Sequence, residues 1–147
     1  MKESMKKIQE IMRRSISEVF EKMFFLFLEP PDDEDITYDM EAAIRFEGSM
    51  SGEVRLLLSR DMAKTMVQNM LALKENGIVT QGMEDCSKEA VNMICGDFLG
   101  NLDSTRVFDL SAPIFRERLG DLELMKNACR MDFDSDGKTV GVIIEID

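Results

Sequence analysis

Histidine is absent from this sequence of 147 residues. It is the side chain that most often binds metals or acts as a general base at neutral pH, and it activates the nucleophile of serine hydrolases and cysteine proteases. A serine of this chain therefore has no such base to activate it. Any chemistry must come from carboxylates, amides, hydroxyls, thiols or the groups of a partner.

Cysteine and positive charge are both scarce. The three cysteines have no C-x-x-C spacing, which argues against a disulfide framework and indicates a reducing compartment. There are 29 acidic against 18 basic residues, and the formal net charge of −11 repels nucleic-acid phosphates and anionic lipids. We therefore expect no nucleic acid among the partners.

Long hydrophobic runs are also missing. The apolar run 23–28 has six residues, whereas about 20 are needed to cross a bilayer. Residues 1–21 are heavily charged and do not have the pattern of a secretory signal. We expect no membrane insertion and a cytoplasmic location.

Two acidic stretches of the sequence are candidate metal sites, but neither has the pattern of one. Residues 32–35 lie between predicted elements, where a run of charge is normally a solvated loop. Residues 132–137 begin like a calcium-binding loop, D-x-D-x-D-G, but the twelfth position is Ile143 instead of the glutamate that the loop requires. The Asp-Gly pair there predicts a hairpin turn, and we expect no metal site.

The chain has the size and composition of one folded domain, with 44% hydrophobic and 32% charged residues. Apolar spacing and turn signals predict the following elements: helices over 2–28, 60–74 and 85–102, the last after a loop through Gln81-Gly82, and strands over 36–46, 53–58, 106–115, 122–133 and 139–146. This order predicts a single α+β domain over 1–147, with helices packed on one face of an antiparallel sheet.

The two halves of the sequence show a weak internal similarity. Residues 18–24 align with 89–95 at an offset of 71 residues, and in each half the helix is followed by strands. This similarity predicts a duplicated helix-strand-strand arrangement, with pseudo-repeats over about 1–75 and 76–147.

The helix predicted over 85–102 has two unlike faces. An apolar stripe of the width expected for a core-facing helix contains Val91, Ile94, Cys95, Phe98, Leu99 and Leu102. Away from this stripe, Asp85, Glu89, Asn92 and Gly96 fall within an arc of about 60°. A carboxylate and an amide thus stand one turn apart, beside a residue that has no side chain.

This polar stripe has an ordinary explanation and a functional one. A glutamate and an asparagine three residues apart are commonplace on surface helices. Yet asparagine is a mediocre helix former, and Gly96 inside a helix costs about 0.5–1 kcal/mol relative to alanine. Gly96 would allow close approach of a partner, or else close packing against a neighbouring helix. In the first helix, Arg14 and Glu21 replace Asp85 and Asn92, so only the second helix keeps the candidate groups.

The pattern Asp85-x-x-x-Glu89-x-x-Asn92-x-x-x-Gly96, followed by a strand containing Pro113, resembles the signature of the CheC/CheX/FliY family of chemotaxis phosphatases. The resemblance extends to the chain length, the order of helices and strands, and the duplication. CheC carries the signature on both related helices, whereas CheX carries it on one. The sequence is therefore more similar to CheX.

The resemblance implies a CheC-like fold and hydrolysis of the aspartyl phosphate of a CheY-like receiver domain. It implies that Asn92 orients the attacking water, that Glu89 contacts the receiver's active-site lysine, and that Asp85 and Gly96 contact the partner. No cofactor is expected on this chain, and magnesium is expected on the receiver. The resemblance also implies a homodimer. The alternative is a non-catalytic adaptor or inhibitor that binds a receiver through the same helix face.

Overall fold

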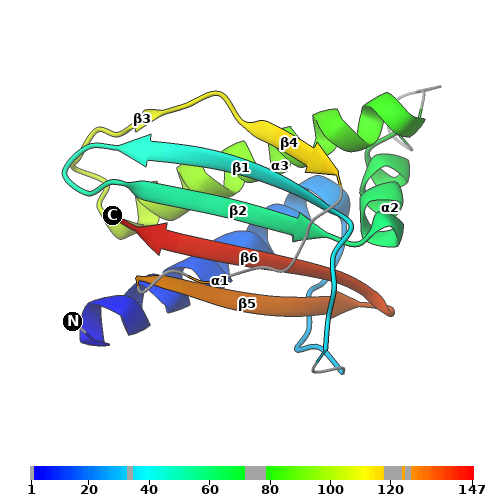
Figure 1. The fold of residues 1–147 in the computed structure, drawn as a ribbon, viewed down its shortest axis with the longest axis horizontal. Helices are drawn as coiled ribbons and strands as arrows, with labels where there is room; N and C mark the ends of the chain where they lie inside the picture. Colours follow the sequence, from blue (N-terminus) through cyan, green and yellow to red (C-terminus); the bar gives the residue numbers. More distant parts are fainter. Residues whose placement is uncertain (1, 33–34, 72–78, 118–123, 125–126) are drawn as a thin grey trace.

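The computed structural model of the chain describes residues 2–32, 35–71, 79–117, 124 and 127–147. Along this part of the chain, one helix is followed by two strands, then two helices, then four strands. Their order is α1 (Lys2–Phe24), β1 (Met40–Glu47), β2 (Gly52–Leu58), α2 (Arg60–Leu71), α3 (Val79–Leu102), β3 (Asp109–Leu110), β4 (Ile114–Glu117), β5 (Ala128–Ser135) and β6 (Lys138–Ile146) (Figure 1).

The strands form one antiparallel sheet in the order β3-β1-β2-β6-β5, and β4 also pairs with β1. Helices α1 and α3 contact each other and lie behind the sheet in Figure 1, while α2 stands at one end. The α+β class and the antiparallel sheet with helices on one face are confirmed. The internal duplication stays a prediction.

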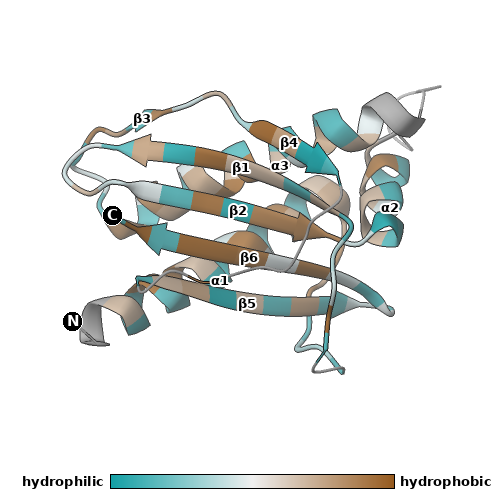
Figure 2. Ribbon diagram, in the orientation of Figure 1, coloured by the Kyte–Doolittle hydropathy of each residue, from teal (hydrophilic) through white to brown (hydrophobic). Residues whose placement is uncertain are grey.

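The core lies between the sheet and the helices. Alternate residues of β1 point into it and are fully or almost fully buried, namely Met40, Ala42, Ile44 and Phe46. On the helix side of the core, α1 contributes the buried stripe Met12, Ile16 and Phe20. Figure 2 shows hydrophobic residues concentrated in the central strands β2 and β6. Burial on one strand face and one helix stripe is the packing that the two periodicities predict.

Helix α1 ends at Phe24, four residues before the predicted end at 28. Phe25 adopts a left-handed backbone conformation with φ of 56°. The N–H of Phe25 donates to the carbonyl of Glu21 and the N–H of Leu26 donates to the carbonyl of Phe20, each at 3.1 Å. The first of these is the bond that an αL cap makes between the residue after the helix and the carbonyl four residues earlier. Phe27, which the prediction includes in this helix, lies beyond its end and is 68% exposed.

The predicted loop through Gln81-Gly82 is wrong, because α3 already begins at Val79. A Cβ atom added to Gly82 would lie 3.0 Å from Cγ1 of Val67 in α2. Gly82 therefore allows close helix–helix contact instead of marking a loop. The predicted end of the preceding helix, at 72–74, lies outside the described residues.

The strand predicted over 106–115 is two short strands, β3 and β4, which both pair with β1. Pro113 lies between them, so it is not in a strand as expected. Proline has no N–H for a sheet ladder, which explains the interruption. The strands expected to start at 36 and 122 begin at Met40 and Ala128, and residues 122–123 and 125–126 of the second prediction lie outside the described residues.

The predicted hairpin at 132–137 is confirmed. Asp136 and Gly137 form a two-residue turn with φ values of 52° and 82°, both of which a type I′ turn requires. The backbone N–H of Gly137 donates to Oδ1 of Asp134 at 2.9 Å. Among the described residues there is no acidic or thiol cluster arranged to hold a metal ion, and none of their helices is long and apolar enough to span a membrane.

Candidate functional site

Burial of one stripe of α3 determines which way its polar side faces. Most of the predicted apolar stripe is at most 4% exposed, and this part comprises Val91, Ile94, Cys95, Phe98 and Leu99. Leu102 is partly buried against the same core. The opposite side of the helix leaves Asp85, Glu89 and Gly96 exposed and Asn92 partly exposed. The predicted two-faced helix is therefore present, with its polar stripe open to solvent.

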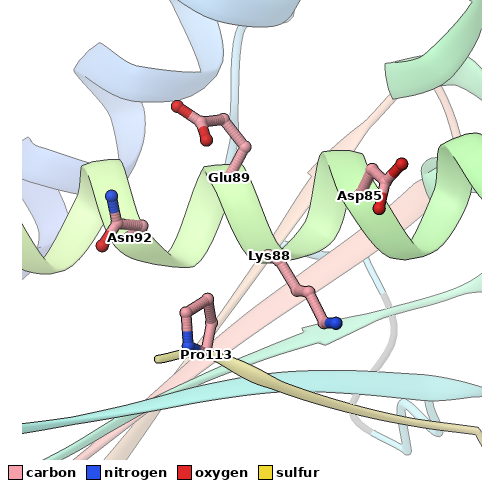
Figure 3. Close-up of a pocket in the computed structure, with 5 residues that line it drawn as sticks. All are labelled: Asp85, Lys88, Glu89, Asn92 and Pro113. Atoms are coloured by element: carbon pink, nitrogen blue, oxygen red, sulfur yellow. The ribbon is translucent and has the colours of Figure 1, made fainter. Parts of the chain in front are cut away.

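Asp85, Glu89 and Asn92 line one shallow pocket of about 420 Å³ together with Lys88 and Pro113 (Figure 3). Four of the five residues come from successive turns of α3, and Pro113 comes from the segment just before β4. In Figure 3, Lys88 extends from α3 toward the side on which Pro113 lies, whereas Glu89 extends from the other side of the helix. The structure thus brings together three of the four predicted site residues.

Gly96 lies one turn further along α3 and lines a neighbouring pocket of about 240 Å³ with Leu99, Gly100 and Phe108, among others. A Cβ atom added to Gly96 would meet nothing within 4 Å. Close packing against another helix in the described part of the chain therefore does not explain the glycine. The bare surface stays available for a partner that approaches the helix backbone.

Lys88 was not predicted as a site residue. Its Nζ atom lies 2.9 Å from Oε2 of Glu84, one turn earlier, and both side chains are partly exposed at 35% and 47%. Lys88 stands three residues after Asp85 and four before Asn92, so the helical period alone places it beside the polar stripe. That spacing was the only signal in the sequence, and it is shared by many surface lysines.

The charged groups of the pocket are the carboxylates of Asp85 and Glu89 and the ammonium of Lys88. Within the described part of the chain, the side chains of Asp85, Glu89 and Asn92 make no hydrogen bond to another group of the protein. They are therefore free to bind groups of a partner or a water molecule. An asparagine amide offers both donors and an acceptor, which suits it to orienting a water.

The cysteines near the site are poor nucleophiles. Burial raises the pKa of the Cys86 thiol, and the carboxylates of Asp85 and Glu89 raise it further. Burial also raises the pKa of Cys95 to about 12. Because the thiolate is the reactive form, these protonated thiols contribute no nucleophile at neutral pH. The candidate chemistry thus remains with the amide and the charged groups of the pocket.

Comparison with known proteins points to one family. Residues 40–131 match the family model described as chemotaxis phosphatase CheX. The matched segment includes every residue that lines the pocket. A search of the curated proteins gives no match.

Solved structures of chemotaxis proteins have a similar fold. The chemotaxis protein CheX from Desulfovibrio desulfuricans is 17% identical with a TM-score of 0.80, over 96% of this chain and 99% of that chain. The chemotaxis protein CheX from Vibrio vulnificus is 23% identical with a TM-score of 0.78, over 95% and 96%. In a CheX-CheY-BeF3-Mg²⁺ complex from Borrelia burgdorferi, the matching chain is 21% identical with a TM-score of 0.75, over 93% and 96%.

Proposed function

The chain belongs to the CheX family of chemotaxis phosphatases, and on this premise we propose that it hydrolyses the aspartyl phosphate of a CheY-like receiver domain. The observation that carries the proposal is the pocket on α3, where Asn92 and Glu89 reach solvent beside Pro113. The crystallised complex of the Borrelia relative with CheY, BeF3 and Mg²⁺ supports a receiver as the partner.

In the proposed reaction, a water molecule attacks the phosphorus atom in line with the bond to the aspartate oxygen. The phosphorus–oxygen bond to the aspartate breaks, which releases inorganic phosphate and restores the carboxylate. Phosphoryl transfer depends mainly on positioning and electrostatic stabilisation. Asn92 supplies the positioning, because its side-chain amide can accept a hydrogen bond from the water and donate another to the phosphoryl group.

The remaining groups of the site hold the receiver in place. Glu89, one turn before Asn92, forms a charge-assisted hydrogen bond with the receiver's active-site lysine. Asp85 extends the same contact surface, and Gly96 leaves room for the receiver's backbone. The receiver supplies its own Mg²⁺, so the chain needs no cofactor. We also propose, from the family resemblance, that the chain acts in the cytoplasm as a homodimer.

The decisive experiment measures the decay of a phosphorylated receiver from the same organism, with and without the chain. Acceleration at substoichiometric amounts of the chain, with release of inorganic phosphate, is the expected result. A stable complex without acceleration would instead indicate a non-catalytic adaptor or inhibitor. Unchanged decay with no complex across the CheY-like receivers of the organism would contradict both readings.

A further inference from the structure

Among the described residues that line the pocket, Lys88 is the one that lies outside the predicted signature. It stands one helical turn before Asn92, and residues four apart on a helix share a face. Figure 3 shows its side chain extended along the side of α3 on which Pro113 lies. Its ammonium points away from Asn92 in Figure 3, and the flexible four-carbon stem allows it to turn toward the place where the proposed reaction needs a phosphoryl group.

The negative charge of the pocket would hinder binding of a phosphoryl group, and the amine of Lys88 can offset it. An aspartyl phosphate approaching Asn92 would meet the carboxylates of Asp85 and Glu89, and like charges repel. The whole chain adds to this repulsion with a formal net charge of −11. Among the residues that line the pocket, Lys88 is the group that carries positive charge and can offset the two carboxylates.

The contact that Lys88 makes within the chain does not prevent this role. Its partner Glu84 is four residues away on the same helix, and both side chains are substantially exposed. Exposed pairs of this kind are weak and are screened by salt. A phosphoryl group carries more negative charge than a carboxylate and offers several acceptor oxygens, so it competes well for the ammonium.

We propose that Lys88 binds the phosphoryl oxygens of the phosphorylated receiver and thereby allows the chain to distinguish the phosphorylated from the unphosphorylated form. The inference rests on the proposed partner, a receiver domain, but not on turnover. It also differs from the role of Glu89, which contacts a lysine present in both forms of the receiver. Lys88 thus determines specificity for the phosphorylated form of the receiver.

The test compares affinities for the receiver with and without bound beryllofluoride and Mg²⁺, measured by titration calorimetry. Lys88→Gln should bind the beryllofluoride-loaded receiver roughly ten- to a hundredfold more weakly than wild type, because a charge-assisted hydrogen bond is lost. Its affinity for the unloaded receiver should change little. Lys88→Arg keeps the charge and should retain most of the preference.

Lys64→Gln is the matched control, because it removes one exposed positive charge from α2, away from the pocket. This variant should keep the wild-type preference. The inference is overturned if Lys88→Gln keeps that preference, if both glutamine variants lose it equally, or if the wild-type chain binds both receiver forms with the same affinity. Thermal unfolding of each variant verifies that the fold is intact.

The outcome is separable from the proposed hydrolysis. If the preference depends on Lys88 while receiver decay is not accelerated, the recognition role stands and the phosphatase proposal fails. If decay is accelerated and Lys88→Gln keeps the wild-type preference, the phosphatase proposal stands and the recognition role fails.

Discussion

Asn92 and Pro113 line the same pocket, although one lies within α3 and the other just before the edge strand β4. Strand β1 brings them together, because α3 packs on β1 and β4 pairs with its outer edge. Proline restricts its own backbone, so Pro113 is suited to form a fixed wall opposite the amide. The site therefore depends on the sheet as well as on the helix.

Replacing Asn92 with alanine should abolish most hydrolysis and leave receiver binding nearly unchanged. The expected loss is about 3–4 kcal/mol in the activation barrier, as for other positioned polar groups that act in a transition state. The rate of receiver dephosphorylation at saturating chain concentration measures it. Glu21→Ala, at the corresponding position of α1, should leave the rate unchanged. Wild-type turnover by Asn92→Ala would contradict the assigned role of the amide.

Replacing Glu89 with glutamine should mainly weaken binding of the receiver. Loss of a charge-assisted hydrogen bond predicts an affinity lower by about 1.5–3 kcal/mol, with a smaller effect on the maximal rate. Calorimetry and the dependence of the rate on chain concentration separate the two effects. The control is Glu18→Gln, which changes the aligned glutamate of α1. Equal losses in both variants would show that general charge, and not a specific contact, is responsible.

Replacing Gly96 with alanine should stabilise the protein and weaken receiver binding at the same time. The added methyl group meets nothing within 4 Å, so better helix propensity should raise the free energy of unfolding by about 0.5–1 kcal/mol. Denaturant unfolding and receiver titration measure the two effects. Gly100→Ala should give the same gain in stability with a smaller loss of affinity, because Gly100 is a turn further from Asn92. Unchanged binding by Gly96→Ala would remove Gly96 from the contact surface.

Replacing Glu41 with glutamine should destabilise the fold at neutral pH without affecting hydrolysis. This carboxylate is 1% exposed and accepts two hydrogen bonds of 2.8 Å from Arg55 and one of 3.2 Å from Arg116. The loss of these charged contacts predicts a free energy of unfolding lower by about 1.5–3 kcal/mol. Glu117→Gln, at an exposed position of β4, is the control and should be nearly neutral.

The effect of Glu41 should also depend on pH. Burial raises the pKa of Glu41, but Arg55 and Arg116 outweigh burial and hold the pKa below its usual value of 4.5. A lowered pKa in the folded state stabilises the fold fully above the unfolded pKa, and this contribution is lost as the pH falls through the folded pKa. Unfolding curves should therefore show a difference between wild type and Glu41→Gln at pH 7 that shrinks below pH 4.5. A difference that grows with acid would contradict this assignment.

Local patterns were sufficient to predict the class of the fold and the orientation of α3. Alternate residues of β1 point into the core, and buried residues of α3 such as Val91, Ile94 and Phe98 are three or four positions apart. Both patterns follow from backbone geometry, so they can be read from residues close together in the sequence. The hairpin at Asp136-Gly137 was predictable for the same reason, because few residues accept a positive φ. The polar stripe of Asp85, Glu89 and Asn92 belongs to this group as well.

Contacts between distant segments required the tertiary structure. The sequence alone predicted a loop at Gly82. In the structure Gly82 lies inside α3, and the close approach of Val67 from α2 explains why a glycine is there. The left-handed conformation of Phe25 likewise depends on how the chain turns back onto the core. Local spacing does not encode such contacts.

The sequence by itself determined the α+β class, the two faces of α3 and the stripe that carries Asn92, because each follows from a helical or strand period. Only the tertiary structure decided that Lys88 and Pro113 complete the pocket and that Gly96 faces open space. The physical reason is that a pocket is formed where separate elements meet, and their relative placement results from the packing of α3 and β4 on β1.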